Sequence, residues 1–274
     1  MKHCGSDPEA ERAHPYRIDK SRVIGMNKIK TTVLLAMLCM ATASQADTLL
    51  GATVSLDGWS MDSSGSISDN KNSQNFNMDS ETPALFSVAL EHPLPLIPNF
   101  RFRYGDLSSS GRNTLSQNFT LNGTTYPLGT AVDVNFDLKS SDFILYYEVL
   151  DNDAVSLDLG LNGKYLDGDL RVNSNSQSAH QTFKGVVPML YGAVKLGVPA
   201  TRLSLFGDFN LLSVGGQTLR DYQAGASYTL IESMAMDFSL RGGYRRFELQ
   251  LDDLDGIYSD WKYDGVFLGI EADF

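Results

Sequence analysis

Apolar and polar side chains alternate along most of the chain from Asp47 to its last residue. Residues 155–165 show this best, because every second position from Val155 to Leu161 is apolar and the positions between are polar or glycine. Alternation with a period of two is typical of β-strands with one apolar and one polar face. It predicts ten strands, over residues 48–60, 82–92, 99–109, 131–150, 154–172, 180–198, 201–213, 218–231, 235–251 and 259–274.

The connections between these strands alternate in length. Tight turns such as 151–153 and 232–233 follow one end of the strands, and polar loops such as 62–81 and 111–130 follow the other. Short turns on one side and long loops on the other are typical of transmembrane barrels, with the turns periplasmic. We therefore predict an all-β chain folded as a transmembrane antiparallel up-and-down β-barrel of about ten strands, with eight or twelve as alternatives. A soluble β-sandwich, which also alternates, remains the competing interpretation.

Two predicted strands change phase. In 131–150 the apolar side chains occupy even positions up to Leu138 and odd positions from Phe143 onward. A β-bulge at 139–142, or the membrane boundary, would account for this, because one extra residue moves every later side chain to the other face. A similar change lies at 242–246. Aromatic residues near predicted strand ends fit interfacial girdles, among them Trp59, Tyr104, Tyr146, Tyr147, Tyr165, Tyr222, Tyr228, Tyr244 and Trp261.

The first 46 residues predict export. Residues 26–46 have a basic start, an apolar run of about a dozen residues and a small-residue end, which is the order of a signal peptide with cleavage after Ala46. Residues 1–25 are interpreted as a spurious or disordered extension, and 47–274 as the barrel. Both cysteines, Cys4 and Cys39, precede the cleavage point. The mature protein is therefore expected to have no disulfide and no cysteine metal site.

The predicted interior is polar and charged. Ten strands enclose a narrow lumen, between the filled interior of eight strands and the channel of sixteen. Its polar faces predict salt bridges that either neutralise buried charge or set the selectivity of a pore. The candidate lumen-lining residues are Arg101, Arg103, Asp133, Glu148, Asp158, Lys164, Lys195, Asp208, Arg241, Arg245 and Glu271.

Motifs for catalysis or cofactor binding are missing from the sequence. It contains no G-x-S-x-G, P-loop or H-E-x-x-H pattern, and His92 and His180 have no triad-like spacing around them. Asp252–Gly256 resembles a calcium loop but has no closing Glu. We predict a chain that is not an enzyme and binds no cofactor or metal. A net charge of −11 disfavours nucleic acid as a partner.

The C-terminal strand resembles the closing strand of outer-membrane barrels, whose last residues are a signal for the barrel-assembly machinery. Its apolar row comprises Val266, Leu268, Ile270, Ala272 and Phe274. Together with the signal peptide and the pairs Gly215-Gly216 and Gly242-Gly243, it resembles a proteobacterial outer-membrane barrel family described by a Gly-Gly feature. The resemblance implies an outer-membrane location in a Gram-negative bacterium. It also implies outer-membrane lipid, lipopolysaccharide and the assembly machinery as partners, and leaves the oligomeric state open.

Two functions fit this architecture. The first is a narrow porin-like channel for small solutes, with the inward charges setting its selectivity. The alternative is a closed structural or surface-interaction barrel that conducts nothing.

Overall fold

The computed structural model describes residues 50–274 except 69–73, 95, 153, 215–216 and 255–256. The predicted extension 1–25, the signal peptide 26–46 and its cleavage site at Ala46 lie outside the described residues. The described part contains strands and no helix, so it has no helix able to cross a membrane. The five shorter strands are β2 (Asp62–Ser68), β3 (Gln74–Asn77), β6 (Ser109–Thr114), β7 (Phe119–Leu121) and β8 (Thr124–Tyr126).

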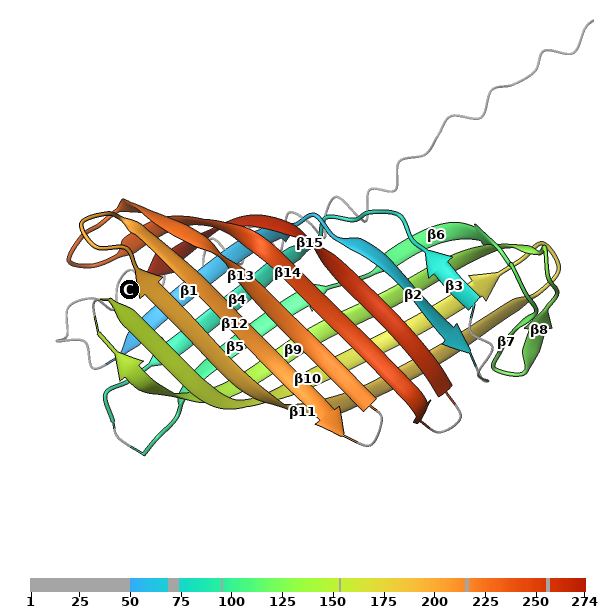
Figure 1. Ribbon diagram of the computed structural model, residues 1–274, viewed down its shortest axis with the longest axis horizontal. Coiled ribbons are helices and arrows are strands. Elements are labelled where there is room, and N and C mark those ends of the chain that lie inside the picture. The colour runs from blue at the N-terminus through green and yellow to red at the C-terminus, as the bar shows by residue number, and fades with distance from the viewer. Residues whose placement is uncertain (1–49, 69–73, 95, 153, 215–216, 255–256) are drawn as a thin grey trace, which may run out of the picture. The chain divides into compact units, whose positions relative to one another are not determined.

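Ten strands form a closed antiparallel barrel (Figure 1). Neighbours in the chain pair with each other around the ring, and β1 pairs with β15 to close it, with Val54 opposite Ala272. The prediction of a ten-stranded up-and-down barrel is confirmed, and the alternative of two stacked sheets is wrong. The barrel strands are β1 (Gly51–Trp59), β4 (Ala84–Glu91), β5 (Asn99–Asp106), β9 (Ala131–Asp151), β10 (Val155–Asn173), β11 (Ser178–Gly197), β12 (Leu203–Val214), β13 (Gln217–Ile231), β14 (Asp237–Leu254) and β15 (Ile257–Asp273).

The barrel has two different ends. The turn end carries the short β4–β5, β9–β10, β11–β12 and β13–β14 connections and the C-terminus. The loop end carries the additional strands β2, β3, β6, β7 and β8 (Figure 1). There β2 pairs with β15 and β6 pairs with β9, so the wall extends beyond β1, β4 and β5. These strands lie within or beside segments that the sequence predicts as polar loops, because their Ser, Gly and Asn residues have low strand propensity.

No bulge interrupts β9 at 139–142. Residues 139–142 stay in continuous register with both β5 and β10, and the shift in the β9–β10 pairing falls instead at Leu157/Asp158. Val134 near the loop end and Ile144 near the turn end both point inward and are fully buried. The apolar side chains therefore change from the inner to the outer face of the wall along one regular strand, without any change in backbone phase.

Strand β14 behaves in the same way. Arg241, Arg245 and Phe247 are all buried on its inner face, and the pairing of 242–246 with β13 and β15 is continuous. At the predicted phase change, residues 242–246, the type of side chain on each face therefore changes, but the backbone pairing does not. In this strand, Gly243 lies opposite Gly225 of β13, and a Cβ on Gly225 would lie 2.2 Å from the carbonyl oxygen of Gly242. The two strands therefore approach too closely for a side chain at either glycine.

The predicted aromatic girdle is only partly correct. Tyr147 and Tyr228 are exposed on the outer face, as a girdle requires. Trp59, Tyr146 and Trp261 instead point inward and are buried. A position near a strand end does not distinguish the two cases, because the interior accepts large rings near both ends of the barrel.

Candidate functional site

The interior of the barrel has three levels, and the level at the loop end is apolar. Large side chains from most of the wall and from the β7–β8 hairpin meet there in one cluster. Phe136 and Trp261 pack edge to face with ring centroids 4.8 Å apart, and Phe247 lies 5.9 Å from Tyr263. The cluster includes Trp59, Met61, Phe76, Leu85, Leu107, Leu115, Phe119, Leu121, Tyr126, Val132, Val134, Phe136, Leu138, Leu166, Leu170, Val172, Met189, Leu219, Phe247, Leu249, Trp261, Tyr263 and Phe267.

The β7–β8 hairpin belongs to this apolar level. The hairpin residues Phe119, Leu121 and Tyr126 are each at most 1% exposed. The Tyr126 hydroxyl donates a 2.8 Å hydrogen bond to the Val172 carbonyl of β10. Burial raises the pKa of the Tyr126 phenol above its ordinary value of 10.0. The hairpin thus packs onto the loop end through apolar contacts and one buried polar contact.

A layer of buried ion pairs lies below the apolar level. Lys164 Nζ is 2.8 Å from both Asp142 Oδ1 and Asp221 Oδ2, and its side chain has no solvent exposure. Arg245 Nη2 is 2.9 Å from the same Asp221 carboxylate. Buried charges are stable only when they are paired and hydrogen-bonded, and here one carboxylate from β13 holds cations from β10 and β14 together.

A second pair of strands joins this layer through Arg103 of β5. Its Nη1 is 2.7 Å from Asp208 Oδ1 of β12, across the interior from its own strand. Gln223 donates a 2.6 Å hydrogen bond to the other oxygen of Asp208. Asn162 Nδ2 contacts Asp142 Oδ1 at 2.7 Å and Asn210 Oδ1 at 2.9 Å. The layer therefore crosses the interior from wall to wall.

Arg241 completes the charged layer at the barrel seam. Its Nη1 is 2.7 Å from Glu271 Oε2, and its Nε is 3.4 Å from Asp57 Oδ1 of β1. The guanidinium carbon also lies 4.6 Å from the centroid of the Phe206 ring. This cation–π contact places an aromatic face against a largely buried charge.

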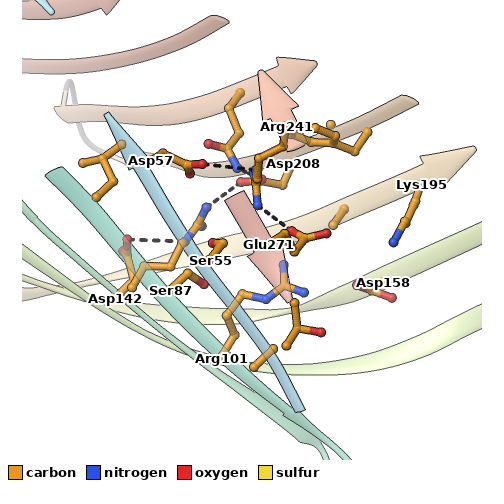
Figure 2. Close-up of a pocket in the computed structure, with 18 of the residues that line it drawn as sticks. Ser55, Asp57, Ser87, Arg101, Asp142, Asp158, Lys195, Asp208, Arg241 and Glu271 are labelled. Carbon is orange, nitrogen blue, oxygen red and sulfur yellow. Dashed lines mark hydrogen bonds and ion pairs between the residues drawn. The ribbon is translucent and has the colours of Figure 1, made fainter. Parts of the chain in front are cut away.

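The turn end contains a polar cavity of about 280 Å³. Its lining runs from the charged layer to Asp151 and Asp273, the last residues of β9 and β15. Arg101 stands at its wall, donating a 2.7 Å hydrogen bond to the Tyr191 hydroxyl, with its guanidinium carbon 5.2 Å from the centre of the Tyr146 ring. Figure 2 shows Asp158 and Lys195 on one side of this space, apart from the paired Arg241 and Glu271.

The structure places nearly all the predicted lumen residues in the interior. Lys164 is buried in the charged layer. The cavity is lined by the other nine, which are Arg101, Arg103, Glu148, Asp158, Lys195, Asp208, Arg241, Arg245 and Glu271.

The placement of Asp133 in the lumen is wrong. It lies on the outer face near the loop end, with its side chain 51% exposed, and Arg112 Nε of β6 donates to its Oδ1 at 2.7 Å. This hydrogen bond lowers the pKa of the Asp133 carboxyl below its ordinary value. In this part of β9 the inner face is apolar, so the polar positions point outward. The reversal along the strand explains the error.

Sequence reasoning did not select several residues that carry the charged layer. Asp142 and Asp221 hold most of its cations, and Asp57 and Asn162 bridge between strands. Asp57 and Asn162 share the parity of inward neighbours and could have been found from it. Asp142 was assigned to a supposed bulge, which hid its inward parity.

The outer face of the barrel carries an apolar belt. Leu161, Val186, Val266 and Leu268 are each more than 60% exposed, pointing away from the interior. A closed barrel leaves no unpaired strand edge, and an apolar outer belt excludes water, so this arrangement suits lipid. The chain is a membrane β-barrel. In the predicted assembly signal, Phe274 closes the seam through backbone hydrogen bonds of 2.8 and 3.2 Å with Ala52.

No metal centre is found in the part of the chain that the structure describes, where no three His, Cys, Asp or Glu side chains are grouped to hold an ion. The calcium-like segment 252–256 lies partly outside the described residues. His180 is exposed at the loop end.

Comparison with solved structures returns other β-barrels at low identity. Outer-membrane protease OmpT from Escherichia coli is 11% identical, with 82% of this chain and 96% of that chain covered and a TM-score of 0.48. The translocator domain of autotransporter NalP from Neisseria meningitidis is 10% identical, with coverages of 92% and 97% and a TM-score of 0.38. Ail, the attachment invasion locus protein of Yersinia pestis, is 14% identical, with coverages of 82% and 99% and a TM-score of 0.33.

These comparisons correct one prediction and leave another open. The prediction that the chain is not an enzyme is contradicted, because a barrel to which it is similar is a protease. Enzymes are therefore no longer excluded, although a likeness at this identity transfers no activity to the chain. No protein-family model and no curated protein matches the chain. The resemblance to a family with a Gly-Gly feature stays a prediction, and Gly215 and Gly216 lie outside the described residues.

Proposed function

We propose that this chain is an integral outer-membrane barrel whose lumen is closed, and that it acts as a structural or surface-interaction protein through its loop end. The observation that carries the proposal is the apolar level at the loop end. Trp59, Phe76, Phe247 and Tyr263 have no exposed surface there. A water-filled path for solutes requires polar walls and room for water, and both are missing from a packed aromatic layer.

The charged layer supports the same proposal. The cations of the charged layer, which a narrow pore would use for selectivity, are already paired, since Lys164 contacts two carboxylates and Arg103 contacts Asp208. A pore residue that selects ions must be free to exchange partners with a passing solute. We therefore favour the closed barrel over the narrow porin-like channel that the sequence also allows.

Export and assembly are part of the proposal. The signal peptide 26–46 would direct export, with cleavage after Ala46. The outward row ending in Phe274 would be recognised by the barrel-assembly machinery, and the apolar belt would contact outer-membrane lipid. Lipopolysaccharide would then face the charged outer residues near the loop end, where Arg112, Arg171 and Lys184 lie.

Planar-bilayer recording of the refolded protein tests the closed lumen. We expect no single-channel steps from folded wild-type protein in about 1 M salt. At this concentration small conductances are visible and exposed charges are screened. Reproducible steps that change with Arg103→Gln would overturn the proposal and support a pore.

A variant with an opened apolar level serves as the matched control. Phe136→Gly, Phe247→Gly and Trp261→Gly together remove the rings that fill the level. Conductance from this variant, once its folding is verified by heat-modifiable mobility on gels, shows that the recording detects an open lumen of this barrel.

A further inference from the structure

The turn-end cavity has more carboxylates than cations. Nine Asp or Glu residues and five Arg or Lys residues line it, a formal excess of four negative charges. Such an excess inside a membrane barrel is costly unless a mobile cation or water compensates for it, because low-dielectric surroundings screen like charges poorly.

The excess is concentrated at the outermost part of the cavity. Asp57, Asp142, Asp208 and Glu271 deeper inside are each within ion-pair distance of an arginine. Among the described residues, no ion pair is formed by Glu148, Asp151 or Asp158, which follow one another around the β9–β10 turn. Asp158 lies directly opposite Glu148 in the strand register.

Asp158 is a buried carboxylate in which one oxygen has no hydrogen-bond donor among the described residues. The residue is only 8% exposed, and its Oδ1 accepts no hydrogen bond from any described residue. Figure 2 shows its carboxylate in the cavity with no interaction drawn to a neighbour. A buried carboxylate oxygen without a donor costs stability, so an unfilled acceptor here points to a ligand or ordered water that supplies the donor.

The nearby cations do not satisfy this carboxylate. Arg101 is engaged with the Tyr191 hydroxyl and lies against the Tyr146 ring. Lys195 lines the cavity from β11 and forms no ion pair with a described carboxylate. Its register partner is Ser156, two residues from Asp158 on the same face, so Lys195 stands at the rim as a competitor for the site.

We propose that the turn-end cavity binds the ammonium group of a small organic amine, with Asp158 as its anchoring carboxylate and Glu148 and Asp151 as its neighbours. An ammonium group donates three hydrogen bonds and accepts none, which matches the unfilled Oδ1 of Asp158 beside the carboxylates of Glu148 and Asp151, neither of which forms an ion pair with a described residue. The alkyl part would lie toward Ala193, which lines the cavity and lies opposite Asp158 in the strand register. A cavity of about 280 Å³ suits a ligand of few heavy atoms.

The inference goes beyond the proposed closed barrel and can fail separately. Binding is measured in detergent without any membrane, whereas closure is measured as conductance. A chain that conducts but binds amines at Asp158 would overturn the proposed function alone, and a silent chain that ignores amines would overturn this inference alone.

Isothermal titration calorimetry of the refolded full chain with cadaverine tests the inference. We expect saturable one-site binding, and about a tenfold rise in Kd for Asp158→Asn, as for the loss of one charge-assisted hydrogen bond. Asp133→Asn, a matched change on the outer face, should leave the Kd unchanged. Lys195→Gln should lower the Kd, because it removes the competing ammonium group. No binding by wild type, or equal binding by Asp158→Asn, would overturn the proposal.

Two sources of the ammonium group are separated in the same experiment. A free amine in the periplasm predicts tighter binding of cadaverine than of an acetylated Gly-Lys-Gly amide. A lysine side chain of a partner protein predicts the reverse. Either order supports an ammonium site, provided that Asp158→Asn weakens both probes while heat-modifiable mobility shows that the variant is folded.

Discussion

Lys164 Nζ lies 2.8 Å from Asp221 Oδ2, and the two side chains are 0% and 2% exposed. They come from β10 and β13, which are separated in the wall by two strands, so the pair spans the barrel interior. Arg245 binds the same carboxylate, and Asp142 holds the other side of Lys164. The charged layer thus ties distant strands together across the interior.

Asp221→Asn should destabilise the barrel by roughly 3–5 kcal/mol, because it leaves Lys164 and Arg245 buried with one anion fewer. Urea unfolding in lipid vesicles measures the change. Adding Lys164→Met should restore part of the loss, since it removes one of the uncompensated cations. The exposed Asp133→Asn is the control and should change the free energy of unfolding little. Equal effects of Asp221→Asn and Asp133→Asn would contradict a tightly buried layer.

The glycine pair between β13 and β14 makes a second prediction. A methyl group at Gly225 would lie 2.2 Å from the Gly242 carbonyl oxygen, and one at Gly243 equally close to the Ala224 carbonyl oxygen. Gly225→Ala should therefore force the strands apart and cost about 1–3 kcal/mol or more. A methyl group at Gly185, by contrast, would have no atom of a described residue within 4 Å apart from its own residue and its two chain neighbours. Gly185→Ala should fold with wild-type yield, and a matching loss of folded yield in both variants would sink this explanation.

The alternating pattern predicted the ten barrel strands because each strand must satisfy lipid on one side and a polar interior on the other. The short strands β2 and β3 escaped this logic, since they stand beyond the belt and contain mostly Ser, Asn and Gly. Local composition there resembles a loop. Only their pairing with β15 and with each other makes them strands.

Docking of the β7–β8 hairpin should weaken at high pH. The Tyr126 phenol has a raised pKa in the folded protein, so its contribution to docking is complete below the ordinary value of 10.0 and is lost as pH rises through the raised value. Brief subtilisin digestion at pH 8 and pH 11 measures hairpin release. At pH 8, Tyr126→Phe should be cut somewhat faster than wild type, because it has lost a hydrogen bond worth about 0.5–1.5 kcal/mol. Between pH 8 and pH 11, its cutting rate should rise less than that of wild type. Identical pH profiles for both proteins would remove Tyr126 from the account.

The sequence predicted a charged interior, but it did not predict which charges pair with each other. Parity placed Arg103, Asp208 and Arg245 in the lumen, because their strands keep polar residues inside along the belt. It failed for Asp133, where the strand has left the belt and the apolar face has become the inner one. Which carboxylate meets which cation depends on strand register and barrel closure, and a single sequence does not encode these as a visible pattern.

Cysteine labelling along β9 tests the central claim, that one regular strand has its apolar side chains inside at the loop end and outside in the belt. In a chain with Cys4 and Cys39 replaced by serine, single cysteines are placed at Asp133, Val134 and Phe143. Asp133→Cys should react readily with a water-soluble maleimide, and Val134→Cys should stay unreactive in the folded protein. A fluorophore on Phe143→Cys should be quenched by brominated lipid. Rapid maleimide labelling of Val134→Cys, or no lipid quenching at Phe143→Cys, would contradict the account.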